Sequence, residues 1–260
     1  MRDPRHVEAV IGDPDDPRLA DYRALRDPAT RVAYEREHGV FVVEGTLAIA
    51  NLLASPYEVR SLLVTPAMRE RLPATDAPVY VAEREVMAAV AGFDVHRGAL
   101  AIATRPPPRE AADVLRDART VLALERLNDH ENVGVLFRVA RALGADAVLL
   151  DGETCDPLYR RAVRVSLGHV LHVPFARTDD LLGALASFTT VALTPSAETR
   201  LEDVPPPERV ALLLGAEGPG LRRETIERAG VRARIAMRAG VDSLNVATAA
   251  AIALHRLGRV

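Results

Sequence analysis

Asn128-Asp-His-Glu-Asn132-Val-Gly134-Val-Leu-Phe-Arg138 is the first of three glycine-bearing segments that decide the fold of this chain. The second is Leu214-Gly215-Ala-Glu217-Gly218-Pro219-Gly220, and the third runs from Ile235-Ala-Met237 into Ser243-Leu244-Asn245. Each segment follows a short apolar run that is typical of a buried strand, and each leads into a helical pattern. Three such corners predict a ligand crevice at the edge of a parallel sheet.

Apolar strands and helices alternate around these segments, which indicates an α/β fold with a mostly parallel sheet covered on both faces. The predicted strands are Thr120 to Leu124, Ala147 to Leu150, Leu171 to Val173, Thr190 to Leu193, Val210 to Leu214 and Val231 to Ala236. The predicted helices are Glu131 to Leu143, Pro157 to Leu167 and Val246 to Leu257. Because the last helix lacks a polar face, we expect it to be buried against the sheet or against a second subunit.

Three consecutive prolines within Arg105 to Arg109 favour an extended linker, because proline continues neither a helix nor a strand ladder. They divide the chain into a domain of residues 1–107 and a domain of residues 108–260. Strand-like and helical runs before the linker predict a small α/β domain of roughly 70 residues behind a polar extension.

Composition sets the remaining bounds. The net charge is −3, and the 33 basic residues are all arginine, so a nucleic-acid site here has to be a local patch. No apolar run approaches the ~18 residues that span a bilayer, and the N-terminus lacks the apolar core of a signal peptide. Cys155 is the single cysteine and forms no internal disulfide. We therefore expect a cytoplasmic protein with no membrane partner.

Arg138 is the first candidate for chemistry, because it lies in an otherwise apolar run. A guanidinium there needs a carboxylate, a backbone carbonyl or a ligand anion, so both an ion pair at the helix edge and a substrate contact are open. Asn132 lies six residues earlier, or about 600° of helical rotation, so the two side chains diverge on the helix.

Glu217 is the second candidate. Its loop lacks the spacing of a dinucleotide fingerprint and the Gly-Lys-Ser/Thr ending of a phosphate-binding loop. A carboxylate among glycines repels phosphate and favours a ligand that presents hydroxyls or amines, although a plain tight turn is the alternative. Ser243 and Asn245 fit the N-cap of the last helix, which stabilises a helix by roughly 1 kcal/mol and is compatible with facing a ligand.

Arginines supply a candidate patch for phosphate contact, with a solvated charged face as the alternative. The patch comprises Arg160, Arg161 and Arg164 at helical spacing, and Arg222 and Arg223 after the glycine loop are positioned to extend it. The histidines show no metal-ligand spacing, so no metal site is predicted.

Together and in this order, the three segments resemble the SpoU (TrmH-type) branch of the SPOUT RNA methyltransferases from about Thr120 to His255. The family's first motif is N-x-G with an arginine four residues beyond the glycine, matched by Asn132, Gly134 and Arg138. Its G-x-E-G-x-G loop is matched by Gly215, Glu217, Gly218 and Gly220, and its third motif by Ile235, Met237, Ser243, Leu244 and Asn245. One departure is Ala236, where the family usually has proline.

The resemblance implies a deep trefoil knot, S-adenosylmethionine as cofactor, a homodimer with residues of both subunits at the site, and methyl transfer to a ribose 2′-hydroxyl in RNA. The N-terminal domain is similar to the family's ribosomal-protein-like domain, especially in Phe41-Val-Val-Glu44-Gly45 and His96-Arg97-Gly98-Ala99-Leu100-Ala101. That domain implies RNA substrate binding and favours rRNA over tRNA.

The resemblance also implies roles for individual residues. The implied catalytic residues are Arg138, Asn132, Glu217, Ser243 and Asn245. The implied cofactor-binding residues are Leu193, Gly215, Glu217, Gly218, Ile235, Met237 and Leu244, and the RNA-binding residues are Arg160, Arg161 and Arg164. Because the pKa of an arginine exceeds ~12, Arg138 is better suited to stabilising a developing alkoxide than to acting as a base.

Two other functions compete with this interpretation. One is a non-catalytic RNA-binding member of the same fold. The other is a nucleotide- or sugar-phosphate-binding α/β enzyme that uses the glycine loop.

Overall fold

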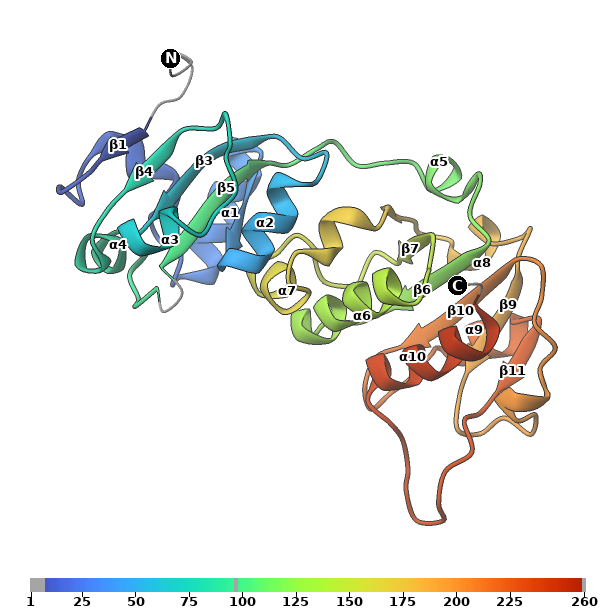
Figure 1. Cartoon of the computed structure of the whole chain (residues 1–260). Coiled ribbons are helices and arrows are strands. Elements are labelled where there is room, and N and C mark those ends of the chain that lie inside the picture. The colour runs from blue at the N-terminus through green and yellow to red at the C-terminus, as the bar shows by residue number, and fades with distance from the viewer. Residues whose placement is uncertain (1–7, 96–97, 259–260) are drawn as a thin grey trace. The chain divides into compact units, whose positions relative to one another are not determined.

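The computed structural model describes residues 8–95 and 98–258, and the chain separates into two compact units (Figure 1). Unit 1 contains Met1–Pro107 and Leu158–Leu171, and unit 2 contains Pro108–Pro157 and His172–Val260. The division after Pro107 matches the linker in the sequence. The segment 158–171 groups with unit 1, whereas the sequence division assigned it to the second domain. His96 and Arg97 lie outside the described residues.

Unit 1 is built on a five-stranded mixed sheet of order β1-β4-β3-β5-β2. β1, β3 and β4 pair in parallel, and β5 pairs antiparallel with both β2 and β3. The strand bounds are β1 (Glu8–Val10), β2 (Val40–Glu44), β3 (Val59–Val64), β4 (Val79–Val81) and β5 (Ala99–Thr104).

One face of this sheet packs on a 3₁₀ turn η1 (Pro17–Tyr22) and on α4 (Arg84–Ala91), where side chains such as Tyr22 and Met87 are fully buried. The helix α2 (Thr46–Leu53) contacts β2 and β5, and α1 (Pro28–His38) contacts β2. The other helical elements of unit 1 are α3 (Pro66–Arg69), α7 (Arg160–Val165) and the 3₁₀ turn η2 (His169–His172).

The segment 158–171 differs from its prediction in form as well as in place. The predicted helix Pro157 to Leu167 is the shorter α7, and the predicted strand Leu171 to Val173 is wrong because this stretch enters η2. Leu167 and Gly168 both have positive φ, which turns the chain before the apolar run begins. Periodicity alone cannot assign so short a run to a strand.

Gly168 lies where the segment approaches α2. Its φ is +82°, and a Cβ there would fall 2.8 Å from the carbonyl oxygen of Ala48, which is backbone and has little room to move. We therefore expect Gly168→Ala to lower the free energy of unfolding by at least about 2 kcal/mol, as measured by urea denaturation. Gly12→Ala is the matched control, because a Cβ at Gly12 would meet nothing within 4 Å. Equal stability of the two variants would contradict this packing.

Unit 2 contains a six-stranded sheet of order β11-β9-β10-β6-β7-β8, in which neighbouring strands pair in parallel. The parallel α/β fold predicted from the sequence is thereby confirmed. The strand bounds are β6 (Thr120–Glu125), β7 (Ala147–Leu150), β8 (Phe175–Arg177), β9 (Thr189–Leu193), β10 (Val210–Gly215) and β11 (Val231–Ala233).

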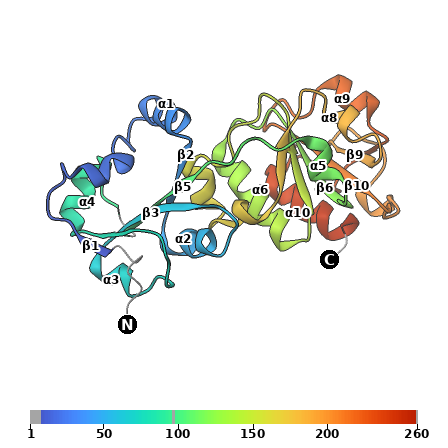
Figure 2. The same cartoon turned by 90° about the horizontal axis from the view of Figure 1, so that it is seen from above.

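Helices cover both faces of the unit 2 sheet (Figure 2). One face packs on α5 (Ala111–Leu115), α8 (Leu181–Ala184) and α9 (Arg223–Arg228) through an apolar cluster that includes Val121, Leu149 and Leu213. The other face carries α6 (His130–Ala142) and α10 (Val246–Leu257), which pack on each other, and α10 also contacts β10. The bounds of α10 agree with the predicted helix. A short 3₁₀ turn, η3 (Leu201–Asp203), also contacts α10.

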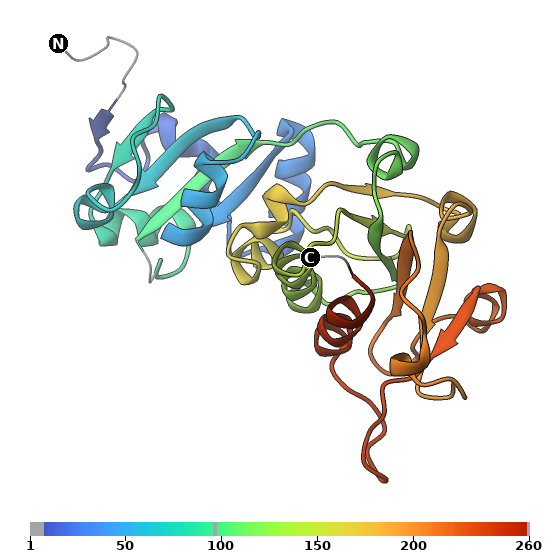
Figure 3. The ribbon, with the colours of Figure 1, turned by 45° about the vertical axis from the view of Figure 1, so that its right-hand side comes forward.

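The register of the sheet brings several predicted residues to one edge. Leu193 ends β9 and pairs with Ala233 at the end of β11, while Gly215 ends β10 beside Glu125 at the end of β6. β11 is shorter than predicted, and residues 234–245 form a long loop that extends from the body of unit 2 before α10 begins (Figure 3).

Candidate functional site

Asn245 joins the three sequence segments. Its Nδ2 donates to Oδ1 of Asn132 at 2.9 Å and to Oε1 of Glu217 at 2.7 Å. Asn132 lies on the first turn of α6, Glu217 on the loop after β10, and Asn245 directly before α10. Residues 113 positions apart in the chain therefore meet at one point at the carboxyl edge of the sheet.

The orientation of the Asn245 amide follows from its hydrogen bonds. Its Oδ1 accepts from the backbone N–H groups of Ala247 at 3.0 Å and Thr248 at 3.4 Å, so Asn245 is the N-cap of α10. Both N–H donors and both acceptor positions of the side chain are then in use. A flipped amide would set oxygen against the oxygens of Glu217 and Asn132. The capping and ligand-facing interpretations of Asn245 are thus compatible.

The glycine loop closes on itself. The Gly220 N–H donates to the Ala216 carbonyl at 2.9 Å, and a Cβ at Gly215 would lie 2.2 Å from the Gly220 carbonyl carbon and the Leu221 nitrogen. This close approach of two backbone stretches requires glycine at 215. The loop turns Glu217 and Gly218 outward to solvent.

Arg138 had two interpretations from the sequence, an ion pair at the helix edge and a substrate contact, and the ion pair is not formed with any described residue. The buried face of α6 carries Val133, Leu136, Phe137 and Ala140, which follow helical spacing, and Arg138 lies outside it. Arg138 is exposed and makes no hydrogen bond or ion pair to any residue in the described ranges 8–95 and 98–258. It does not join the cluster around Asn245 within one chain.

The remaining implied site residues lie on or beside the long loop. Ile235 and Met237 are half-buried just after β11, while Ser243 and Leu244 are exposed. Among the described residues of the loop, Asn245 is the one that hydrogen-bonds to Asn132 or Glu217.

The candidate arginine patch is largely occupied by an ion pair within unit 1. Arg160 Nη1 lies 2.7 Å from Oε2 of the buried Glu44, and Arg164 Nη1 lies 3.4 Å from Oε1 of the same carboxylate. The Arg160 guanidinium also stacks over Phe93 at 4.7 Å from the ring centroid. Arg160 and Arg164 therefore dock the segment 158–171 onto unit 1, and Arg161 is exposed.

Arg222 differs from its expected role as well, because it pairs with acids of unit 2 and is not a free phosphate contact. No local pattern in the sequence points to its partners Glu125 and Asp151, since a single acidic residue at the end of a strand is common. Two cavities of about 640 and 470 Å³ border Arg222. Neither is lined by Asn132, Glu217 or Asn245.

Cys155 lies in a surrounding that disfavours the thiolate. Burial raises the pKa of its thiol to about 12, and the neighbouring Asp156 adds to the shift, so the thiol is protonated at neutral pH. Within the described part of the chain, His, Cys, Asp and Glu form no group of three or more that could hold a metal ion. No helix among the same residues has the length and apolar character to cross a bilayer.

Three polar strand-to-helix corners meet at the carboxyl edge of a parallel α/β sheet. This arrangement is typical of α/β proteins that bind a ligand at the carboxyl ends of their strands. Residues 119–255 match the model of the SpoU rRNA methylase family. An uncharacterized tRNA/rRNA methyltransferase of Mycobacterium tuberculosis is 44% identical over 262 residues, which cover 96% of this chain and 91% of the relative. The 23S rRNA (guanosine(2553)-2′-O)-methyltransferase of Bacillus subtilis is 28% identical, covering 92% and 95%.

Solved structures agree with the sequence relatives. An rRNA methyltransferase from Sinorhizobium meliloti, solved with AdoMet (S-adenosylmethionine) bound, superposes with a TM-score of 0.81 at 27% identity, covering 96% of this chain and 97% of that one. The chain belongs to the SpoU rRNA methylase family, and it is a methyltransferase.

Proposed function

We propose that this protein transfers a methyl group from S-adenosylmethionine to a ribose 2′-hydroxyl of ribosomal RNA. The observation that carries the proposal is the meeting of Asn132, Glu217 and Asn245 at one sheet edge. The names of the related 2′-O-methyltransferases support the ribose hydroxyl as acceptor and rRNA as substrate class.

The residues at this edge fit the cofactor. The backbone of the glycine loop is accessible, because a Cβ at Gly218 or Gly220 would meet nothing within 4 Å. Leu193, Gly215 and Ile235 lie at the ends of adjacent strands and would hold the adenine and its ribose, with Gly218, Met237 and Leu244 around them. The outward carboxylate of Glu217 would accept hydrogen bonds from hydroxyls or an amine of the ligand.

When bound, S-adenosylmethionine supplies a methyl group already activated by its sulfonium. The protein's task is then to align the 2′-hydroxyl and to stabilise the charge that develops on its oxygen. Arg138 is suited to this charge stabilisation, because a guanidinium carries a positive charge and presents several N–H donors in a planar fork. Asn132 and Ser243 would orient the ribose or its phosphate.

We infer that the active form is a homodimer and that Arg138 of one subunit completes the site of the other. Arg138 lacks a partner among the described residues of its own chain. The neighbouring helix α10 exposes Ile252, although its other large apolar side chains, Val246, Leu254 and Leu257, are buried. The deep knot of the family would bring the long loop 234–245 back across the sheet edge to α10.

Unit 1 would bind the RNA substrate, as the resemblance to ribosomal-protein-like domains implies. Arg160, Arg161 and Arg164 stay our candidates for RNA contact within this segment, with Arg160 and Arg164 held in place by Glu44. The association of such a patch with RNA weakens as salt rises.

The test of this function is methyl transfer from tritium-labelled S-adenosylmethionine to rRNA and tRNA from cells that lack the gene, followed by nucleoside analysis. We expect label in a 2′-O-methylated nucleoside of rRNA. Cofactor binding by calorimetry without label in either RNA would indicate the non-catalytic RNA-binding member. Binding of a dinucleotide instead of S-adenosylmethionine would replace the proposal with a nucleotide-binding enzyme.

Asn245→Ser separates the two tasks of Asn245. Serine is a comparable N-cap, so the free energy of unfolding should stay within about 0.5 kcal/mol, whereas Asn245→Ala should lose about 1 kcal/mol. Serine has one hydroxyl donor in place of two amide donors and cannot bridge Asn132 and Glu217. We expect methyl transfer to fall at least tenfold in both variants, measured by initial rates. Full activity of the serine variant would refute the bridging role.

A further inference from the structure

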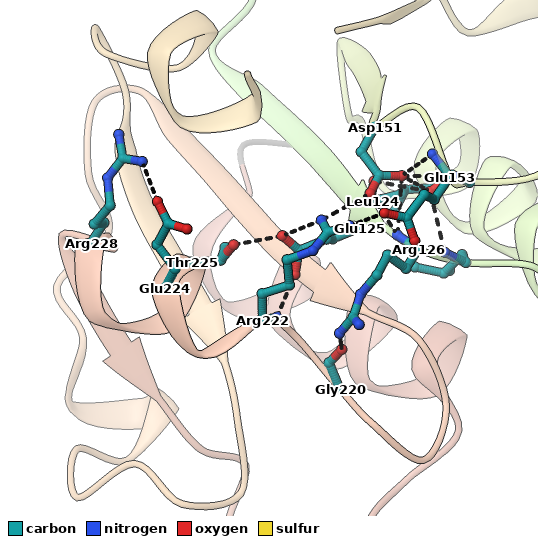
Figure 4. Close-up of polar contacts among 12 residues, drawn as sticks. Leu124, Glu125, Arg126, Asp151, Glu153, Gly220, Arg222, Glu224, Thr225 and Arg228 are labelled. Carbon is teal, nitrogen blue, oxygen red and sulfur yellow. Dashed lines mark hydrogen bonds and ion pairs between the residues drawn. The ribbon is translucent and has the colours of Figure 1, made fainter. Parts of the chain in front are cut away.

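Two buried carboxylates, Glu125 and Asp151, lie at the ends of the adjacent strands β6 and β7, close to Arg222 and Arg126 (Figure 4). Glu125 is 3% exposed and Asp151 is 6% exposed. Removing two carboxylates from water costs several kcal/mol each unless they are paired and hydrogen-bonded. The hydrogen-bond partners of the two carboxylates show which segments of the chain they hold in place.

Glu125 binds the start of α9. Its Oε2 accepts from the backbone N–H of Arg222 at 2.5 Å, and its Oε1 accepts from the Thr225 hydroxyl at 2.5 Å and from Arg222 Nη1 at 3.2 Å. Arg222 is the second residue after Gly220, so Glu125 fixes the point where the chain leaves the glycine loop.

Asp151 binds the start of the other corner. Its two oxygens accept from the backbone N–H of Arg126 at 3.1 Å, and its Oδ1 accepts from the Thr154 hydroxyl at 2.7 Å. Arg222 Nη1 lies 3.3 Å from Oδ2 of Asp151. Burial raises the pKa of Asp151, but the hydrogen bonds from Thr154, Arg126 and Arg222 outweigh burial and hold the pKa below its usual value. Asp151 is therefore ionised at neutral pH.

Arg126 connects the two corners directly. It has φ of +58°, an uncommon conformation for a non-glycine residue, and its Nη2 donates to the Gly220 carbonyl at 3.1 Å. Arg126 begins the stretch that leads to Asn132, and Gly220 ends the loop that carries Glu217. The same two stretches meet again at their far ends, where Asn132 and Glu217 both bind Asn245.

We propose that Arg222, held between Glu125 and Asp151, is a positioning residue for the glycine loop. It fixes the loop backbone in the position from which Glu217 reaches Asn245, which also binds Asn132. This proposal rests on the proposed function, because it assigns the loop to the methyl-transfer site. Arg222 acts through the loop backbone and touches none of the three side chains at the site. Its guanidinium contacts three carboxylates, those of Glu125, Asp151 and Glu153, as shown in Figure 4.

The hydrogen bonds and ion pairs among Glu125, Arg126, Asp151 and Arg222 form a cluster that holds the loops and not the strands of the sheet. The strands β6, β7 and β10 are already joined by their own parallel ladders. The cluster adds bonds to the backbone at Arg126, Gly220 and Arg222, which all lie beyond the strand ends. A cluster that served stability alone would have no need to bind both corners of one site.

Arg222→Lys is the test, because lysine keeps the charge but cannot contact three carboxylates with a planar fork. It is combined with Glu217→Gln in a double-mutant cycle, and kcat and KM for S-adenosylmethionine are measured well below the melting temperature. Arg228→Lys controls for the arginine-to-lysine change itself, because Arg228 forms an ion pair with Glu224 on the exposed surface of α9. Arg31→Lys controls for lost stability, because it weakens the buried Arg31–Glu35 pair of unit 1.

We expect Arg222→Lys to lower kcat at least tenfold. The kcat of the double variant should be no more than about threefold below that of the less active single variant. Both controls should stay within twofold of the unmodified protein. Multiplying effects in the double variant would overturn the proposal, as would an equal loss of kcat in Arg31→Lys at matched melting temperature.

Hydrogen exchange keeps this result separate from a failure of the proposed function. The Gly220 amide donates to the Ala216 carbonyl, so we expect it to be protected from exchange. We expect Arg222→Lys to accelerate this exchange at least tenfold, while Arg228→Lys leaves it unchanged. Unaltered exchange at Gly220 would overturn the positioning role even if the protein methylates no RNA. The last outcome is faster exchange in Arg222→Lys together with no RNA methylation by the unmodified protein. That result would support the dependence of the loop on Arg222 and reject the proposed function.

Discussion

Arg138→Ala abolishes methyl transfer, by our expectation at least a thousandfold in kcat, while the affinity for S-adenosylmethionine stays within a few fold. The reason is that Arg138 is exposed on α6 and belongs neither to the glycine loop nor to the strand ends that would hold the cofactor. A preorganised guanidinium near a developing alkoxide acts mainly on the transition state. Calorimetry with S-adenosylmethionine and single-turnover rates on rRNA measure the two quantities separately.

Arg141→Ala is the matched control for this prediction, because Arg141 is a second exposed arginine on the same helix. It should leave the rate within a few fold. Mixing Arg138→Ala subunits with an Asn245→Ala variant should restore part of the activity if one subunit supplies Arg138 to the other. Equal loss of cofactor binding and of rate in Arg138→Ala would refute the assigned role, and absence of restoration would refute the shared site.

Gly215→Ala is expected to lose cofactor affinity by at least a hundredfold. A Cβ at this position would lie 2.2 Å from backbone atoms of Gly220 and Leu221, and neither can move without opening the loop. The strain should also lower the free energy of unfolding by about 1–3 kcal/mol. Calorimetry gives the affinity and urea denaturation gives the stability.

The control for this prediction is Gly218→Ala, where an added Cβ meets nothing within 4 Å and the cost is the positive φ of +84°. Gly218→Ala should therefore be milder than Gly215→Ala in both measurements. If the Gly215→Ala protein binds S-adenosylmethionine normally, the glycine loop is not part of the cofactor-binding site.

The sequence predicted the parts of this fold that depend on local pattern. The parallel sheet, the buried helix α10 and the meeting of Asn132, Glu217 and Asn245 follow from apolar runs, capping residues and strand-to-helix corners. These features are determined within a few residues or by the rule that parallel strands end at one edge.

What the sequence did not predict depends on distant partners. Arg160 and Glu44 are 116 positions apart, and no local pattern indicates that they pair. Likewise, the apolar run around Arg138 left both an ion pair and a substrate contact open, because sequence alone does not show which residues of the helix face the sheet. Glu125 and Asp151 gained their importance from Arg222, which is 97 and 71 positions away from them.

The return of residues 158–171 to unit 1 has a consequence for how this protein can be cut or recombined. A fragment ending at Pro107 would keep the buried carboxylate of Glu44 without its two arginines and would leave β2 without α7, one of the helices that contact it. The two units therefore cannot be exchanged between relatives as simple modules joined at the proline linker. A viable chimera has to carry the 158–171 insert together with the N-terminal portion from the same parent.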